Sequence, residues 1–171
     1  MPTTRGTFML RHDNGSALDS GSLLQVSVGR TGAPVPPPEL VLVPAIAFHS
    51  LCAHHLLPFY GVVHIGYVHG ENQLRQAEFT RVVEACSRGI QVQQRMTIRM
   101  GLWLHHQLAP RGLGVLVEGG YTCETDRGGA PFGGPKTTLS FYGSLRHSAH
   151  EQREFLTATR RELGKGKFGH E

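Results

Sequence analysis

The chain has 171 residues, enough for one domain with a hydrophobic core and too few for two domains of ordinary size. Its formal net charge of +4 is mildly basic. However, it has no block of Lys and Arg and no nucleic-acid-binding motif, so anionic small molecules are the expected ligands and nucleic acid is not. No window approaches the roughly 18 apolar residues that a membrane-spanning helix needs, and the N-terminus lacks the apolar segment of a signal peptide. We therefore expect no membrane partner and a cytoplasmic location, where the three widely spaced cysteines stay reduced rather than forming a disulfide framework.

Residues 1–171 are interpreted as one α+β domain. Residues 1–22 are polar and expected to be poorly ordered at their start, and a turn-rich connector with three consecutive prolines spans 29–39. Two glycine-rich or polar segments, 127–135 and 164–171, are predicted as a loop and a tail. Apolar periodicity predicts strands at 23–28, 40–50, 62–68, 113–118 and 137–145, and helices at 77–88, 93–108 and 151–163. From residue 40 onward the predicted order is strand, strand, helix, helix, strand, strand, helix.

The run Phe48–Tyr60 contains the sequence Cys52-x-x-His55. A thiolate and an imidazole at this spacing can both reach one zinc ion, and Cys123, after the strand at 113–118, is the best candidate for a third ligand. Three protein ligands with a fourth position left for water are typical of a catalytic zinc site. His54, beside the metal ligand, is available to move protons. The alternative is that Cys52 is a buried apolar residue and the two histidines are solvated.

These motifs resemble the GTP cyclohydrolase I family, over about residues 41–161. The matching segments, in the order and spacing of that family, are 52–61 (CAHHLLPFYG), 91–95 (QVQQR), Cys123, Arg127 and 153–156 (REFL). The resemblance implies a T-fold, which is an antiparallel sheet with two helices on one face. It also implies a homo-oligomer, commonly a decamer of two stacked pentamers, with active sites at subunit interfaces.

The resemblance further implies roles for individual residues. Zinc would be held by Cys52, His55 and Cys123, and would activate a water that attacks C8 of a purine and leads to loss of formate. His54 corresponds to a histidine that serves acid–base chemistry at the ring being opened. The remaining positions that correspond to the substrate side of the family site are Arg81, Gln93, Gln94 and Arg127.

The sequence departs from the family on that substrate side. Gln94 replaces a glutamate that accepts hydrogen bonds from guanine, and glutamine offers one acceptor and one donor instead. A Ser-Lys pair that contacts the triphosphate corresponds to Ala77-Glu78, which would repel a polyanion, although a carboxylate is also favourable at a helix start. Tyr121 replaces a second catalytic histidine, and is either a catalytic phenol or a strand tyrosine packed over the metal.

Three hypotheses remain. The first, which we favour, is a zinc-dependent cyclohydrolase that opens or deformylates a purine-like C–N heterocycle other than GTP, with His54 and Tyr121 as catalytic residues. The second is GTP cyclohydrolase I proper, converting GTP to 7,8-dihydroneopterin triphosphate and formate. The third is an inactive T-fold subunit that binds a ligand or partner, which the retained metal and histidine motif argues against.

Overall fold

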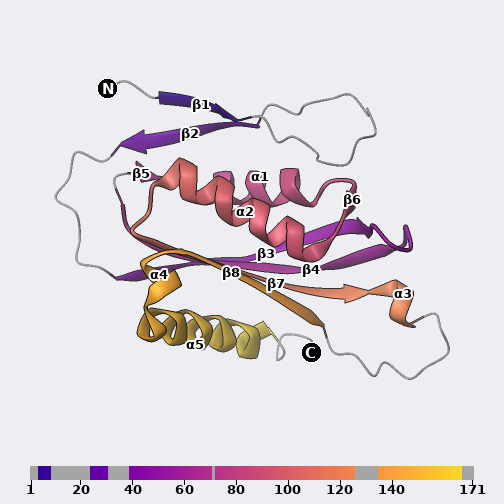
Figure 1. Cartoon of the computed structure of the whole chain (residues 1–171). Helices are drawn as coiled ribbons and strands as arrows, with labels where there is room; N and C mark the ends of the chain where they lie inside the picture. The colour runs from indigo at the N-terminus through magenta and orange to yellow at the C-terminus, as the bar shows by residue number, and fades with distance from the viewer. Residues whose placement is uncertain (1–3, 9–23, 31–38, 71, 126–134, 167–171) are drawn as a thin grey trace.

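The computed structural model describes residues 4–8, 24–30, 39–70, 72–125 and 135–166 (Figure 1). These residues form a mixed α+β arrangement of strands and helices, as the sequence predicts. In chain order the elements are β1 (Thr4–Phe8), β2 (Leu24–Arg30), β3 (Leu40–Cys52), β4 (Pro58–Val68), β5 (Asn72–Gln73), α1 (Gln76–Ser87), β6 (Ile90–Gln91), α2 (Gln93–Leu108), β7 (Gly112–Tyr121), α3 (Thr122–Thr125), β8 (Lys136–Gly143), α4 (Ser144–His147) and α5 (Ala149–Gly166).

The main sheet has five strands in the order β6-β3-β4-β7-β8. All its pairings are antiparallel except that of β3 with the short strand β6. Side chains of β3 alternate between buried and exposed from Ile46 to Cys52, after a bulge that shifts the register between Val43 and Ile46. This alternation gives the sheet one face that packs against helices and is the reason the segment is recognisable as a strand.

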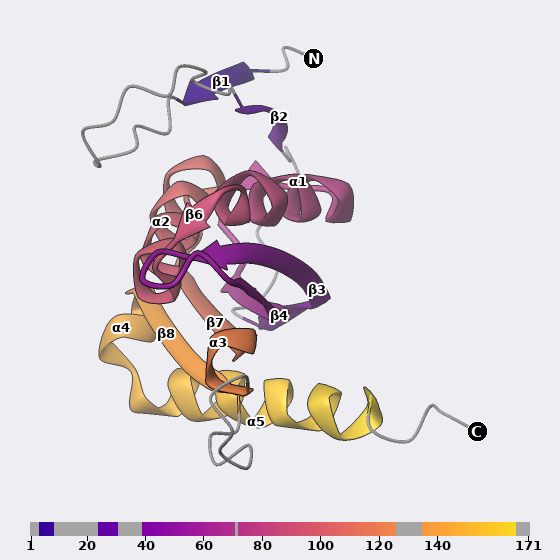
Figure 2. The same ribbon diagram turned by 90° about the vertical axis from the view of Figure 1, so that its right-hand side faces the viewer.

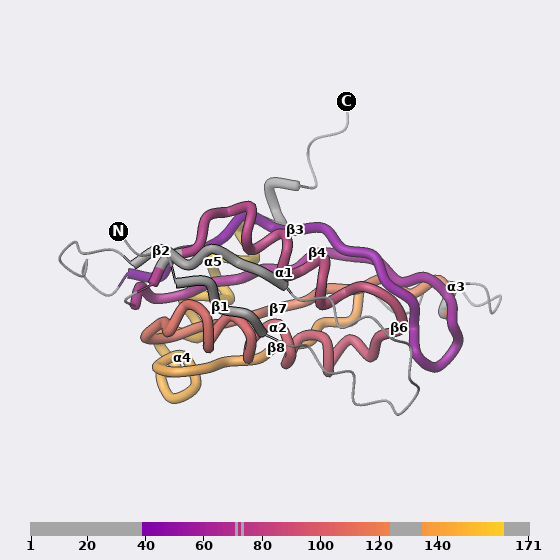
Figure 3. The backbone as a smooth tube through the Cα atoms, turned by 90° about the horizontal axis from the view of Figure 1, so that it is seen from above, coloured from indigo at the N-terminus to yellow at the C-terminus, as the bar shows by residue number. Residues whose placement is uncertain are grey.

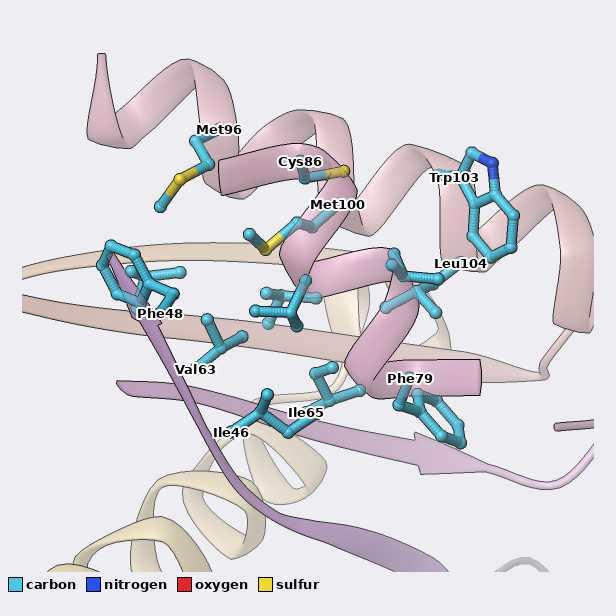
Figure 4. Close-up of a cluster of buried hydrophobic side chains, with 14 of the residues drawn as sticks. Ile46, Phe48, Val63, Ile65, Phe79, Cys86, Met96, Met100, Trp103 and Leu104 are labelled. Carbon is cyan, nitrogen blue, oxygen red and sulfur yellow. The ribbon is translucent and has the colours of Figure 1, made fainter. Parts of the chain in front are cut away.

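Helices α1 and α2 cover one face of this sheet (Figures 1 and 2). Their apolar side chains interdigitate with those of β3, β4 and β7 in the larger of two buried clusters, part of which Figure 4 shows. Helix α2 has the bounds that the sequence predicts, because Met96, Met100 and Leu104 recur on one side of it and are fully buried. It ends where Ala109 adopts a left-handed conformation before Pro110.

Helix α5 lies against the opposite face of the sheet (Figures 1 and 2). Its Phe155 is fully buried in a second cluster with Leu116 of β7 and Leu145 of α4. Gly66 makes room for this packing, because a Cβ there would lie 2.5 Å from the Phe155 ring. The main sheet therefore lies between two helical layers, with the predicted pair of helices on one face and the predicted C-terminal helix on the other. This is the T-fold arrangement expected from the sequence.

A second sheet, of order β1-β2-β5, lies on the far side of α1 and α2 from the main sheet (Figure 2). The prediction of a strand at 23–28 is confirmed by β2, whereas β1 falls in the segment 1–22 and was not predicted. The predicted loop lies mostly outside the described residues, as does part of the predicted tail, although α5 continues as far as Gly166. No helix in the described ranges is long and apolar enough to cross a membrane.

The last strand ends earlier than the sequence predicts. The predicted strand 137–145 stops at Gly143, and Ser144–His147 form the short helix α4. Gly143 has a φ of 60°, a conformation that side chains other than glycine rarely adopt, and the amide of Ser144 donates a 2.8 Å hydrogen bond to the Arg111 carbonyl. The chain therefore leaves the sheet at Gly143, and Leu145 packs with Phe155 of α5 in the second buried cluster.

His64 is a buried polar residue between the main sheet and α5. Its side chain is 1% exposed, and neither ring nitrogen has a hydrogen-bond partner among the described residues. Burial lowers the pKa of His64, while the carboxylates of Glu118 on β7 and Glu162 on α5 act in the opposite direction. The folded protein therefore holds this histidine neutral more strongly than the unfolded chain does.

We predict that the free energy of unfolding decreases as the pH falls through the ordinary histidine pKa of about 6.5. The folded-state pKa of His64 is lower, so the unfolded chain takes up the proton first and is stabilised relative to the folded state. Denaturant unfolding between about pH 7.5 and 5.5 should show a smaller pH dependence in His64→Leu than in the wild type. The exposed His106→Gln serves as the matched control and should keep the wild-type slope; equal slopes in all three proteins would contradict the prediction.

Candidate metal centre

The turn between β3 and β4 brings Cys52 and His55 together. The amide of Cys52 donates to the Leu57 carbonyl at 2.8 Å, and the amide of Leu56 donates to the Cys52 carbonyl at 2.8 Å. Leu56 adopts a positive φ of 55°, which closes the turn. The backbone of this turn therefore fixes both side chains, with the Sγ of Cys52 3.9 Å from the Nδ1 of His55.

Cys123 reaches the same point from the end of β7. Antiparallel pairing places Tyr121 opposite Phe59 at the start of β4, and the hydroxyl of Thr122 donates to the Pro58 carbonyl at 2.7 Å. The short helix α3 then carries Cys123. Figures 1 and 3 show the β3–β4 turn, α3 and the start of α2 gathered at one end of the molecule.

The ligand atoms of Cys52, His55 and Cys123 all lie within 4.8 Å of one another. A tetrahedral zinc ion with bond lengths of about 2.0–2.3 Å places its ligand atoms roughly 3.5–3.8 Å apart, so small side-chain movements would close this group around an ion. The two cysteines are buried and the histidine is exposed, which leaves one side of the group open to solvent. Two sulfurs and one imidazole nitrogen with an open side fit a metal ion that keeps a position for water.

His54 lies in the same turn as His55, and its ring centroid is 6.3 Å from that of its neighbour. Its side chain is exposed to solvent. The turn is also bound to β6, just before α2 begins, because the amide of Ala53 donates to the Gln91 carbonyl at 3.0 Å. This bond brings the first turn of α2 next to the metal-binding residues.

Gln93 and Gln94 begin α2 but face opposite ways. Gln94 is exposed, whereas Gln93 is buried and its amide bonds to other parts of the chain. The Gln93 amide nitrogen donates to the carbonyls of Val117 and Lys136, and its oxygen accepts a 2.9 Å bond from the hydroxyl of Tyr121. The burial of Gln93 follows from helical periodicity, since Gln93 precedes the buried Met96 and Met100 by three and seven positions and so lies on the same side of α2.

Arg81 is exposed and forms an ion pair with Glu78, at 3.7 Å between Nη1 and Oε2. The side chain of Glu78 is 5% exposed and also approaches Arg75 at 3.9 Å. These residues occupy the first half of α1, whose last turn leads into β6 and the metal group. At 1.5 Å per residue, Arg81 and Glu78 therefore lie roughly 9–14 Å back along the helix axis. Arg127 lies outside the described residues.

Two residues beside the metal group were not singled out from the sequence. Phe59 stacks on Tyr121 with ring centroids 4.7 Å apart, and Thr138 accepts a hydrogen bond from Gln93 at 3.2 Å. Both contacts depend on the strand register, which the sequence does not specify. The ammonium group of Lys136 lies 5.1 Å from the centre of the Tyr121 ring, so the first residue of β8 brings a positive charge to this side of the site.

Fold and site together define a T-fold protein with a Cys-His-Cys group that could hold a metal ion at one end of its sheet. Residues 22–160 match the family model described as GTP cyclohydrolase I. The chain belongs to the GTP cyclohydrolase I family.

Curated relatives support this assignment. The chain is 38% identical over 120 residues to GTP cyclohydrolase 1 of Deinococcus radiodurans, covering 70% of this chain and 56% of the relative. It is 38% identical over 122 residues to GTP cyclohydrolase 1 of Homo sapiens, covering 71% and 49%. The chain therefore matches only about half the length of these relatives.

Among solved structures, the chain resembles the archaeosine synthase QueF-Like in its apo form. The TM-score is 0.52 at 17% sequence identity, covering 63% of this chain and 97% of that one. At this level of identity the likeness concerns the fold alone, and it agrees with the T-fold.

We predict that the purified protein carries about one metal ion per chain and that Cys123→Ala loses most of it, since a two-ligand group binds metal much more weakly. Elemental analysis of dialysed protein measures the occupancy. Cys86→Ala is the matched control, because Cys86 is a buried cysteine of α1 outside the group and its loss should leave the metal in place. Full occupancy in Cys123→Ala would remove this residue from the site.

Proposed function

We propose that this chain is a zinc-dependent cyclohydrolase that opens or deformylates a purine-like C–N heterocycle, and that GTP is not its preferred substrate. The observation that carries the proposal is the Cys52-His55-Cys123 group in a chain of the GTP cyclohydrolase I family. A zinc ion held there would supply a Lewis acid that activates water for attack on a ring carbon.

His54 is the residue we assign to proton transfer. It is the residue before His55 in sequence and belongs to the same short turn. The short turn therefore keeps the His54 imidazole close to the candidate metal group. Its exposure leaves room for a heterocycle against it. In this position it can accept a proton from the attacking water and return it to a ring nitrogen as the C–N bond breaks.

Gln94 is the first reason to expect a substrate other than GTP. Its side chain is exposed on the first turn of α2, three residues after the Gln91 carbonyl that binds the metal-site turn. A guanine edge presents two donors, and the glutamine amide offers only one acceptor beside one donor. Where the bound heterocycle excludes water from this edge, the unmatched donor costs about 1–3 kcal/mol. Gln94 therefore favours an edge that presents one donor beside one acceptor.

Glu78 is the second reason. Its carboxylate lies between Arg75 and Arg81, so it offsets the positive charge that a triphosphate would need on this surface. Arg81 and the undescribed Arg127 remain as anion-binding candidates, which suits a substrate with less charge than a triphosphate. GTP cyclohydrolase I proper is the alternative function, and the 38% identity to proteins of that name favours it.

We also propose that the chain works as a homo-oligomer, with a decamer of two pentamers as the assembly to test for, in a reducing compartment such as the cytoplasm. In the described residues the outer edge of β8 has no partner strand and that of β3 pairs only with the two-residue β6. Unpaired edges favour association through additional strands, and Leu139 is exposed on β8.

Light scattering at micromolar concentration should therefore give a mass several times that of the 18.7 kDa chain. A stable monomer of one chain mass would contradict the assembly proposal, and the metal site would then have to work within one subunit.

We predict that zinc-loaded wild-type protein converts GTP to 7,8-dihydroneopterin triphosphate at a small fraction of the rate with its own substrate. The mismatched amide of Gln94 and the carboxylate of Glu78 each weaken the binding of GTP in the transition state. A loss of about 1.4 kcal/mol in this binding lowers the rate tenfold. Pterin fluorescence after oxidation measures this activity. Formate release from a panel of purine bases, nucleosides and monophosphates identifies the substrate that replaces GTP.

The His54→Ala variant is the control for this assay. It should retain the metal and lose roughly 10²–10⁴-fold in turnover of any active substrate, because only the proton-transfer group is removed. Efficient GTP turnover by the wild type would instead support GTP cyclohydrolase I proper. No turnover of any compound by metal-loaded protein would support the binding-subunit hypothesis.

A further inference from the structure

The two halves of the candidate metal group come from distant parts of the chain, and the segment that runs from β6 into α2 is hydrogen-bonded to the chain beside each of them. The Gln91 carbonyl accepts a 3.0 Å hydrogen bond from Ala53, inside the turn that carries Cys52 and His55. Two residues later, the Gln93 amide oxygen accepts from Tyr121, two residues before Cys123. The segment 91–93 therefore links the two sides of the site.

The orientation of the Gln93 amide follows from its surroundings. Its nitrogen lies 3.0 Å from the Val117 carbonyl oxygen and 2.8 Å from that of Lys136, and a carbonyl can only accept. Turning the amide over would bring its oxygen against both carbonyls. The nitrogen therefore faces them, and the oxygen must face Tyr121.

The hydroxyl of Tyr121 is in consequence a donor. It gives its hydrogen to the Gln93 oxygen at 2.9 Å, in a network that continues through Thr138 to Thr97. A hydroxyl held as a donor by a buried amide is poorly suited to take a proton from a substrate. The Gln93 amide hydrogens are likewise directed at acceptors of the same chain and not at a ligand.

The Tyr121 ring is fixed as firmly as its hydroxyl. Phe59 of β4 covers one face at 4.7 Å with an angle of 5° between the ring planes, so the Lys136 ammonium at 5.1 Å lies over the other. The next residue, Thr122, is bound to the Pro58 carbonyl. Tyr121 and Thr122 together determine where α3 begins, and hence where the sulfur of Cys123 lies relative to Cys52 and His55.

We propose that Tyr121 and Gln93 are positioning residues of the metal site, which hold Cys123 at the separation that a metal ion requires. This inference rests on the proposed function, because it assumes that the Cys-His-Cys group binds a metal. It gives Tyr121 the role of a residue packed beside the metal and not that of a second proton carrier. It also gives Gln93 a role other than substrate binding.

The test uses Tyr121→Phe, which removes the hydroxyl and keeps the ring stacked on Phe59. Tyr142→Phe is the matched control. The Tyr142 hydroxyl likewise joins a strand of the main sheet to α2, from β8, by donating to the Ile98 carbonyl at 3.0 Å. Metal affinity is measured by competition with a chelator. The visible spectrum of the Co²⁺-substituted protein reports ligand geometry independently of activity.

We expect Tyr121→Phe to bind zinc roughly tenfold more weakly, the lower end of the loss found when residues around the ligands of a metal site are changed, and to shift the Co²⁺ spectrum. Tyr142→Phe should leave both unchanged. Gln93→Met removes the acceptor while keeping Tyr121, and it should weaken zinc binding and shift the spectrum as Tyr121→Phe does. It therefore provides the test if Tyr121→Phe does not fold.

Wild-type metal affinity and spectrum in both Tyr121→Phe and Gln93→Met would overturn the proposal. If turnover of Tyr121→Phe were nevertheless lost, Tyr121 would be a catalytic phenol. A wild-type protein that binds no metal would refute the proposed function itself, and this outcome is visible before any variant is made.

Discussion

The pairing of β4 with β7 is the constraint on which the site depends. Its register runs from Val68 opposite Gly112 to Phe59 opposite Tyr121, and β4 is joined to β3 by the turn that carries Cys52. Side chains alternate across a strand, so a slip of one residue would turn Tyr121 to the other face and move it away from Gln93. The pairing of β4 with β7 therefore determines the position of Cys123 relative to Cys52 and His55, in addition to holding the core strands together.

Long periodic elements could be predicted from the sequence, and the reason is visible in their burial. The stripe of Met96, Met100 and Leu104 defines α2 over its whole length. The start of β4 could not be placed, since Gly61 interrupts the alternation between Phe59 and Val63. Elements of two or four residues, such as β6, α3 and α4, exist because of tertiary hydrogen bonds and leave no periodic signal.

At the site, the candidate metal ligands could be predicted from the sequence, but the hydrogen-bond partners of Gln93 could not. Thiol and imidazole side chains at a C-x-x-H spacing indicate a metal because few other functions need them together, and the structure brings Cys123 to the same point. The environment of Gln93 was not predictable, although its burial follows from helical periodicity. Its partners Val117, Lys136 and Tyr121 come from β7 and β8, and only the strand register determines them.

The structure divides the site into a part held by the fold and a part exposed to solvent. Cys52 and Cys123 are buried and their positions follow from backbone pairing, so a change there disturbs both metal binding and packing. Gln94 and Arg81 project from helix surfaces, where substitutions usually change stability by less than about 0.5 kcal/mol. Exposed positions such as Gln94 and Arg81 can therefore be substituted while the buried part of the Cys-His-Cys group stays in place. This physical division permits the Cys-His-Cys group to stay in place while exposed positions such as Gln94 differ, and it is the reason that we propose a changed specificity and not a lost activity.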